Sequence, residues 1–238
     1  MKNKSADLYR DKLASSDLTV ADGKRLKYEI VDNPKKLQDH FHDVPAFKIP
    51  YINIDGKDTG FYRIRYLSDT RRGFTKVTKT KERRYDQPAS ELPQLYFPPM
   101  DSKKGWKQLL ENPAIPLVFT EGELKAACST KHGIPCIALG GVWNFKSKKN
   151  GLFRLSASED IEFKGRTVFI VFDSDSATNP QVLHAQYKFA EEISKLGGIP
   201  IVVNIPKVED KKHGIDDYIL EFGITAFKDL LKDTDNQS

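Results

Sequence analysis

The sequence of 238 residues predicts an α/β fold, in which a roughly four-stranded parallel sheet is flanked by helices and preceded by a smaller, basic α+β subdomain. Two observations lead to this prediction. After residue 115, short apolar runs alternate with helix-length amphipathic runs, as consecutive βαβ units require. The run Thr167–Phe172 is apolar at nearly every position, which is typical of a strand buried on both faces of a sheet.

The segment before residue 100 is predicted to contain a short helix over Ala6–Ser15 and a β-hairpin over Phe47–Tyr66. The hairpin is expected because two alternating runs of apolar residues flank the turn sequence Asp55-Gly56-Lys57-Asp58. Alternation along the second strand would place Arg63 and Arg65 on the same face.

The second half of the chain is predicted to form the parallel sheet. Four prolines between Pro88 and Pro99 indicate a connector, and we therefore expect domains over residues 1–100 and 101–238. In chain order, the elements expected in the second domain are a strand at Pro116–Thr120, a helix at Glu121–Lys131, a strand at Pro135–Leu139, an irregular basic stretch at Lys146–Asn150, the strand Thr167–Phe172, a helix at Gln181–Leu196, a strand at Ile199–Ile205 and a helix after Gly214.

Charge is divided unevenly along the chain. The net charge is +5, but residues 151–238 hold 10 Lys+Arg and 15 Asp+Glu, or −5, so residues 1–150 carry +10. A basic front half favours a polyanionic partner, and an acidic back half suggests carboxylates that bind a cation. Because no stretch approaches the roughly 18 apolar residues of a membrane span and no signal peptide is present, we expect a cytoplasmic protein without a membrane partner.

The basic charge is densest between residues 63 and 84, where nine Lys and Arg residues face two acids. Aromatic residues are interleaved with them, as in grooves that neutralise phosphates and stack the bases of single strands. A solvated loop beside an edge strand would give the same pattern. We favour nucleic-acid binding, and the residues expected to carry it are Arg63, Arg65, Arg71, Arg72, Lys76, Arg83 and Arg84.

Acidic residues follow the predicted strands at the points where they end. Glu121 follows the first strand, Asp173 and Asp175 follow the third, and Asp216 comes soon after the fourth. In open parallel sheets these ends meet at one edge, where functional groups collect. Oxygen ligands of this kind suit Mg²⁺ or Mn²⁺. Helix capping would explain a single acid at each strand end, but not so many acids at one edge.

At this point the sequence resembles a known family. The motifs Thr120-Glu121-Gly122-Glu123, Leu139-Gly140-Gly141, Phe172-Asp173-Ser174-Asp175 and Gly214-Ile215-Asp216-Asp217-Tyr218 resemble those of the Toprim domain of primases, topoisomerases and certain nucleases. They are closest to an uncharacterised Toprim-like domain found in phage, plasmid and mobile-element replication proteins.

The resemblance implies roles for these residues. Glu121, Asp173 and Asp175 would be catalytic, and together with Asp216 they would hold Mg²⁺ or Mn²⁺. Gly140 and Gly141 would let the backbone pass close to a phosphate. Lys125 departs from the family pattern, because primases place an acid four residues after the glutamate. It would either bind a phosphate or be a solvated helix lysine.

The function implied by the resemblance is metal-dependent nucleotidyl transfer on a single-stranded DNA template with NTPs, as in a primase or primase-like replication protein of a mobile element. A replicative helicase would be one means of choosing a start site. Two alternatives are a Toprim-type nuclease and a degenerate module that only binds nucleic acid, which Lys125 favours. The run Cys128, His132, Cys136 has no fourth zinc ligand nearby, and we expect both thiols to be packed in the core.

Overall fold

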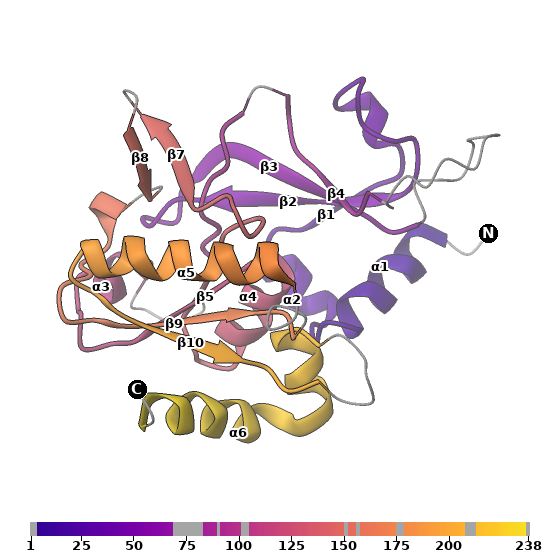
Figure 1. The fold of residues 1–238 in the computed structure, drawn as a ribbon. Helices are drawn as coiled ribbons and strands as arrows, with labels where there is room; N and C mark the ends of the chain where they lie inside the picture. The colour runs from indigo at the N-terminus through magenta and orange to yellow at the C-terminus, as the bar shows by residue number, and fades with distance from the viewer. Residues whose placement is uncertain are drawn as a thin grey trace. The chain divides into compact units, whose positions relative to one another are not determined.

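The computed structural model describes residues 4–68, 83–89, 91–100, 105–149, 152–155, 158–174, 179–207 and 213–236. The chain divides into two compact units (Figure 1). Unit 1 comprises Met1–Tyr51 and Asp58–Glu91, and unit 2 comprises Ile52–Lys57 and Leu92–Ser238. Among the described residues, no helix is both long and apolar enough to cross a membrane.

Unit 1 is a four-stranded sheet with two short helices, and the strand order is β1-β2-β3-β4. The pairs β1/β2 and β3/β4 are antiparallel. Tyr9 and Tyr28 pack against Phe47 of β2, with ring centroids 5.3 and 5.4 Å from it. In chain order the elements are α1 (Lys4–Ala14), α2 (Val20–Arg25), β1 (Glu29–Val31), the 3-10 helix η1 (Pro34–Lys36), β2 (Ala46–Ile52), β3 (Asp58–Tyr66) and β4 (Tyr85–Asp86).

The elements predicted for the front half are present in unit 1. Helix α1 corresponds to the expected helix, and β2 and β3 are the two neighbouring strands of the expected hairpin. Along β3, Ile64 and Tyr66 are almost completely buried, whereas Arg63 and Arg65 on the other face are partly exposed. Arg63 and Arg65 therefore share one face of β3, as predicted, although Phe61 on that same face is buried.

Unit 2 is built on a parallel sheet with the strand order β10-β9-β5-β6. Helix α5 covers one face of this sheet, and α4 and α6 lie on the other (Figure 1). The fold class predicted from the sequence is therefore confirmed. The elements are α3 (Trp106–Leu110), β5 (Leu117–Thr120), α4 (Glu123–Lys131), β6 (Cys136–Ala138), β7 (Lys146–Lys149), β8 (Leu152–Leu155), the 3-10 helix η2 (Ser158–Asp160), β9 (Thr167–Phe172), α5 (Pro180–Lys195), β10 (Ile199–Asn204) and α6 (Ile215–Asn236).

The basic stretch after β6 differs from the expectation. We expected residues 146–150 to be irregular, but β7 and β8 form an antiparallel pair in which Lys146 faces Leu155. The reason is that β7 has no apolar residue, so its sequence lacks the alternation that predicts a strand.

A buried arginine holds together the segments that lead into the two central strands, β5 and β9. Arg166 directly precedes β9 and is fully buried. Its guanidinium donates hydrogen bonds of 2.6 Å to each of three carbonyl oxygens, those of Leu110, Ile115 and Glu162. These carbonyls belong to the end of α3, the segment before β5 and the segment before β9. One side chain thus ties the amino ends of the two central strands together.

We predict that Arg166→Met lowers the free energy of unfolding of unit 2 by about 3 kcal/mol, because three buried or partly buried carbonyls lose a charged donor. Urea unfolding followed by tryptophan fluorescence measures this, since Trp106 and Trp143 both lie in unit 2. Lys164→Met is the matched control, because Lys164 is exposed on the same segment. A change below about 0.5 kcal/mol in Arg166→Met, which is typical of surface substitutions, would contradict the assignment.

Candidate active site

The carboxyl edge of the parallel sheet brings three predicted acids into one cluster. Glu121 directly follows β5, Asp173 directly follows β9, and Asp216 lies in the first turn of α6. Asp173 and Asp216 are 7% and 6% exposed, respectively. Because β5 and β9 are parallel neighbours, their carboxyl ends deliver Glu121 and Asp173 to the same place.

Lys125 lies in the middle of this cluster. Its Nζ is 3.1 Å from Glu121 Oε1 and 2.5 Å from Asp173 Oδ1, and its side chain is 19% exposed. Glu121 precedes α4 and Lys125 lies in its first turn, four residues later, a spacing that lets the two side chains meet. The structure places the ammonium of Lys125 between carboxylates, so Lys125 is not a solvated helix lysine, and phosphate binding stays a prediction.

The acids also determine the charge state of Lys125. Burial by itself would lower the pKa of the ammonium group, but the negative charges of Asp173, Glu121 and Asp216 outweigh it and raise the pKa above its ordinary value. Lys125 is therefore positively charged at any physiological pH.

Gly214 provides the space for this lysine. A Cβ atom at position 214 would collide with Lys125 Cε and would lie 2.9 Å from Asp173 Oδ1 and 3.0 Å from Asp216 Oδ1. The residue before α6 must therefore lack a side chain, because the backbone passes against all three groups.

Ser174 and His213 join the two loops that carry Asp173 and Asp216. The Ser174 N–H donates to the His213 carbonyl at 2.8 Å, and the His213 N–H donates to Ser174 Oγ at 2.9 Å. His213 Nε2 also lies 2.9 Å from Glu221 Oε2 of α6. Sequence reasoning missed these two residues, because no motif connects positions 39 residues apart.

The glycine turn and the remaining aspartate are the other predicted parts of this site. Gly140 and Gly141 have φ values of 69° and 145°, which glycine tolerates best. Asn144 closes their turn by donating from Nδ2 to the Gly140 carbonyl at 2.8 Å. Asp175 lies outside the described residues.

The predicted nucleic-acid residues belong to unit 1. Arg63 and Arg65 both lie over the ring of Tyr85. The Cζ atom of Arg63 is 4.9 Å from the ring centroid, and that of Arg65 is 5.0 Å from it. Arg65 also donates to the Tyr66 carbonyl at 2.6 Å and to the Arg84 carbonyl at 3.3 Å, so it links the end of β3 to the residue before β4. Arg83 pairs with Asp86 at 3.3 Å, and Arg84 is exposed. Arg71, Arg72 and Lys76 lie outside the described residues.

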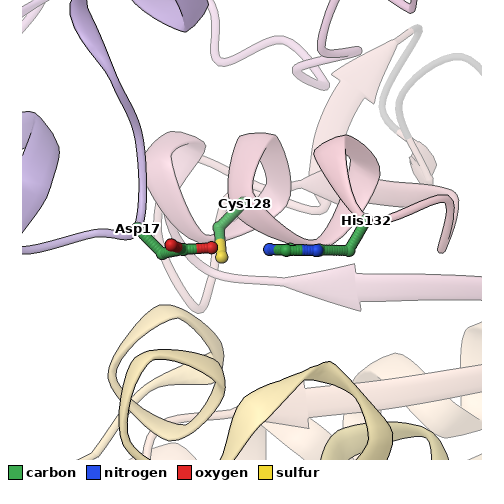
Figure 2. A group of neighbouring side chains, drawn as sticks. All are labelled: Asp17, Cys128 and His132. Carbon is green, nitrogen blue, oxygen red and sulfur yellow. The ribbon is translucent and has the colours of Figure 1, made fainter.

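The two cysteines are packed in the core, as expected. Cys128 and Cys136 are both fully buried, and burial raises the pKa of the Cys136 thiol. Figure 2 shows Cys128 on α4 and His132, which directly follows the last residue of that helix. Asp17, which is also drawn there, belongs to unit 1.

The donor atoms of the acid cluster fit a hard cation. Carboxylates from three segments converge there, and carboxylate oxygens are the ligands that Mg²⁺ and Mn²⁺ prefer. The structure also demonstrates that this place accommodates positive charge, because the ammonium of Lys125 lies there. Glu121, Asp173 and Asp216 would supply carboxylate oxygens to a divalent ion bound at this place.

The domain of unknown function DUF3854 matches residues 105–226, slightly more than half of the chain. The chain belongs to the DUF3854 family. The match includes β5, β9 and the start of α6, and so it contains the whole acid cluster of Glu121, Lys125, Asp173 and Asp216. No curated protein matches the chain.

Solved structures show which fold this DUF3854 protein has. The zinc-binding and RNA polymerase domains of the Aquifex aeolicus primase are 13% identical with a TM-score of 0.60, and the similarity covers 98% of this chain and 56% of that one. The RNA polymerase domain of Mycobacterium tuberculosis primase DnaG in complex with double-stranded DNA is 15% identical with a TM-score of 0.57, covering 97% and 74%. The E. coli primase catalytic core is 13% identical with a TM-score of 0.54, covering 98% and 74%. The DUF3854 protein has the fold of a primase core but spans little more than half of the Aquifex chain.

We predict that Gly214→Ala lowers the free energy of unfolding by about 1–3 kcal/mol, because the new methyl group collides with the side chains around Lys125. Gly105→Ala is the matched control, since a Cβ there meets no atom within 4 Å and Gly105 has an ordinary φ of −69°. Chemical denaturation measures both variants. Equal stability of the two would show that Lys125 does not pack against Gly214.

Proposed function

We propose that this DUF3854 protein is a metal-dependent nucleotidyltransferase that acts on a DNA template, a primase or primase-like replication protein of a mobile element. The observation that carries the proposal is the convergence of Glu121, Asp173 and Asp216 at the carboxyl edge of a sheet with the fold of primase cores. Structural similarity at this level of identity supports the fold, and the acids supply the link to chemistry.

The proposed roles follow from the placement of the acids. Glu121, Asp173 and Asp216, with Asp175, would hold Mg²⁺ or Mn²⁺. When bound, the ion would neutralise nucleotide phosphates and lower the pKa of an attacking hydroxyl group. The hydrogen bonds between Ser174 and His213 hold the loop that carries Asp173 next to the loop that leads to Asp216. The turn at Gly140 and Gly141 would leave backbone groups open to a phosphate.

The basic face of unit 1 is proposed to hold single-stranded template. Arg63 and Tyr85 supply a cation and an aromatic ring on one surface, the combination that single-strand binders use. Arg83 and Arg84 extend that charge, and we include Arg71, Arg72 and Lys76 on the basis of sequence. NTPs would be the other substrates, the cytoplasm the compartment, and a replicative helicase a further partner.

A second function is favoured by one observation. Lys125 already neutralises part of the acid cluster, as expected in a module that binds nucleic acid without catalysis. A nuclease remains the alternative chemistry, because the same acids are able to activate water for in-line displacement at phosphorus.

Primer synthesis distinguishes these functions. With single-stranded DNA, labelled NTPs and Mn²⁺, we expect short oligonucleotides, and we expect Asp173→Asn to reduce their yield on the order of 100-fold because it removes a carboxylate charge from the cluster. Asp229→Asn, at an exposed position of α6, is the matched control and should be unaffected. Cleavage of the DNA would favour the nuclease. DNA binding without either product would leave only the binding module.

We predict that the double variant Arg63→Gln/Arg84→Gln weakens single-stranded DNA binding and lowers the slope of log Kd against log salt by about 1.4, because each lost phosphate contact on a single strand contributes about 0.7. Arg65 and Arg83 are spared, since they bind a carbonyl and Asp86 within unit 1. Lys24→Gln/Lys35→Gln makes the same charge change at exposed positions of unit 1. If that control lowered the slope equally, the DNA would not be bound by the basic face.

A further inference from the structure

We propose that the ammonium group of Lys125 is a resident cation of the acid cluster, which takes the place of a divalent ion between Glu121 and Asp173. It follows that the cluster binds at most one divalent ion while Lys125 is present. This inference deepens the proposed function and rests on the acid cluster being its metal site.

The first argument is position. The carboxylates of Glu121 and Asp173 come from different strand ends, and the point at which they converge is filled by Lys125 Nζ, 3.1 and 2.5 Å away. An ammonium group offers three donors and no acceptor, so it bridges carboxylates from separate segments as a cation does. A divalent ion and this ammonium cannot occupy the same point.

The second argument is that Lys125 is held in place. Its side chain is 19% exposed, and the backbone at Gly214 lies directly against its Cε. Surface lysines of the same unit contrast with it. Lys188 and Lys195 pair with acids on their own helix and are 43% and 57% exposed, so their ammonium groups are able to move into solvent. Lys125 instead joins α4 to the end of β9.

The third argument is charge. Among the described residues of the cluster, Glu121, Asp173 and Asp216 contribute three negative charges and Lys125 contributes one positive charge, which leaves two negative charges. Asp175 lies outside the described residues and is not counted. One divalent ion neutralises that remainder. Removal of the lysine charge would leave three crowded carboxylates, a state that requires either protonation or additional cations.

The test is direct binding of Mn²⁺ to the full chain without DNA or nucleotide, measured by titration calorimetry and by the paramagnetic resonance of free Mn²⁺. We expect Lys125→Met to bind Mn²⁺ on the order of tenfold or more tightly than the wild type, because the competing charge is gone. Lys125→Arg keeps the charge and should not gain affinity. Lys188→Met, which removes a lysine from an exposed ion pair, is the matched control and should behave as the wild type.

A second measurement keeps Lys125, so that the test does not depend on the folding of the lysine variants. The Asp173→Asn variant should bind at most one Mn²⁺ fewer than the wild type. Two ions lost on this substitution, or an unchanged Mn²⁺ affinity in folded Lys125→Met, would overturn the proposal. A Lys125→Met chain that folds only when Mn²⁺ is added would support it.

These outcomes are independent of primer synthesis. If the wild type makes no primer but Lys125→Met gains Mn²⁺ affinity, the resident cation is supported and the proposed function is contradicted. If the wild type makes primers but Lys125→Met gains no Mn²⁺ affinity, the proposed function is supported and the resident cation is contradicted.

Discussion

The ion pairs of Lys125 with Glu121 and Asp173 are the interaction on which the acidic edge of the parallel sheet in unit 2 depends. Parallel strands deliver their following residues to one edge, and in this chain those residues are acids. Their mutual repulsion would be costly in a place where Asp173 and Asp216 are more than nine-tenths buried. The lysine compensates that repulsion with a charge supplied by the chain itself, so the edge can form without an external cation.

The packing around this lysine explains several residue choices at once. Gly214 leaves room for its side chain, the four-residue spacing brings Lys125 of α4 next to Glu121, which precedes that helix, and the pairing of Ser174 with His213 holds two loops against each other. The DUF3854 match contains all of these positions, which belong to different segments of the sequence. The cluster is thus one structural unit rather than a row of separate motifs.

Much of this fold follows from the sequence, and the exceptions have physical causes. The run Thr167–Phe172 identifies its strand to the residue, because burial on both faces requires apolar side chains throughout. The strand Lys146–Lys149 could not be predicted, because its residues show no alternation. The acids at the strand ends were foreseeable from topology. The direction in which the Lys125 side chain points was not foreseeable, since its spacing of four residues from Glu121 allows a surface position equally well. The contact of Ser174 with His213 depends on tertiary structure alone.

The hydrogen bonds of Arg166 lie at the amino ends of β5 and β9, opposite the acid cluster. They affect the cluster because both strands lead directly to its acids. Leu117 of β5 is aligned with Val168 of β9, and both strands run uninterrupted from that edge to Glu121 and Asp173. A slip of one residue between them would move one acid by about 3.3 Å relative to the other and reverse the face of every side chain on the slipped strand. Arg166 therefore helps to fix the register of β5 against β9. This register sets the separation at which Glu121 and Asp173 can share one cation.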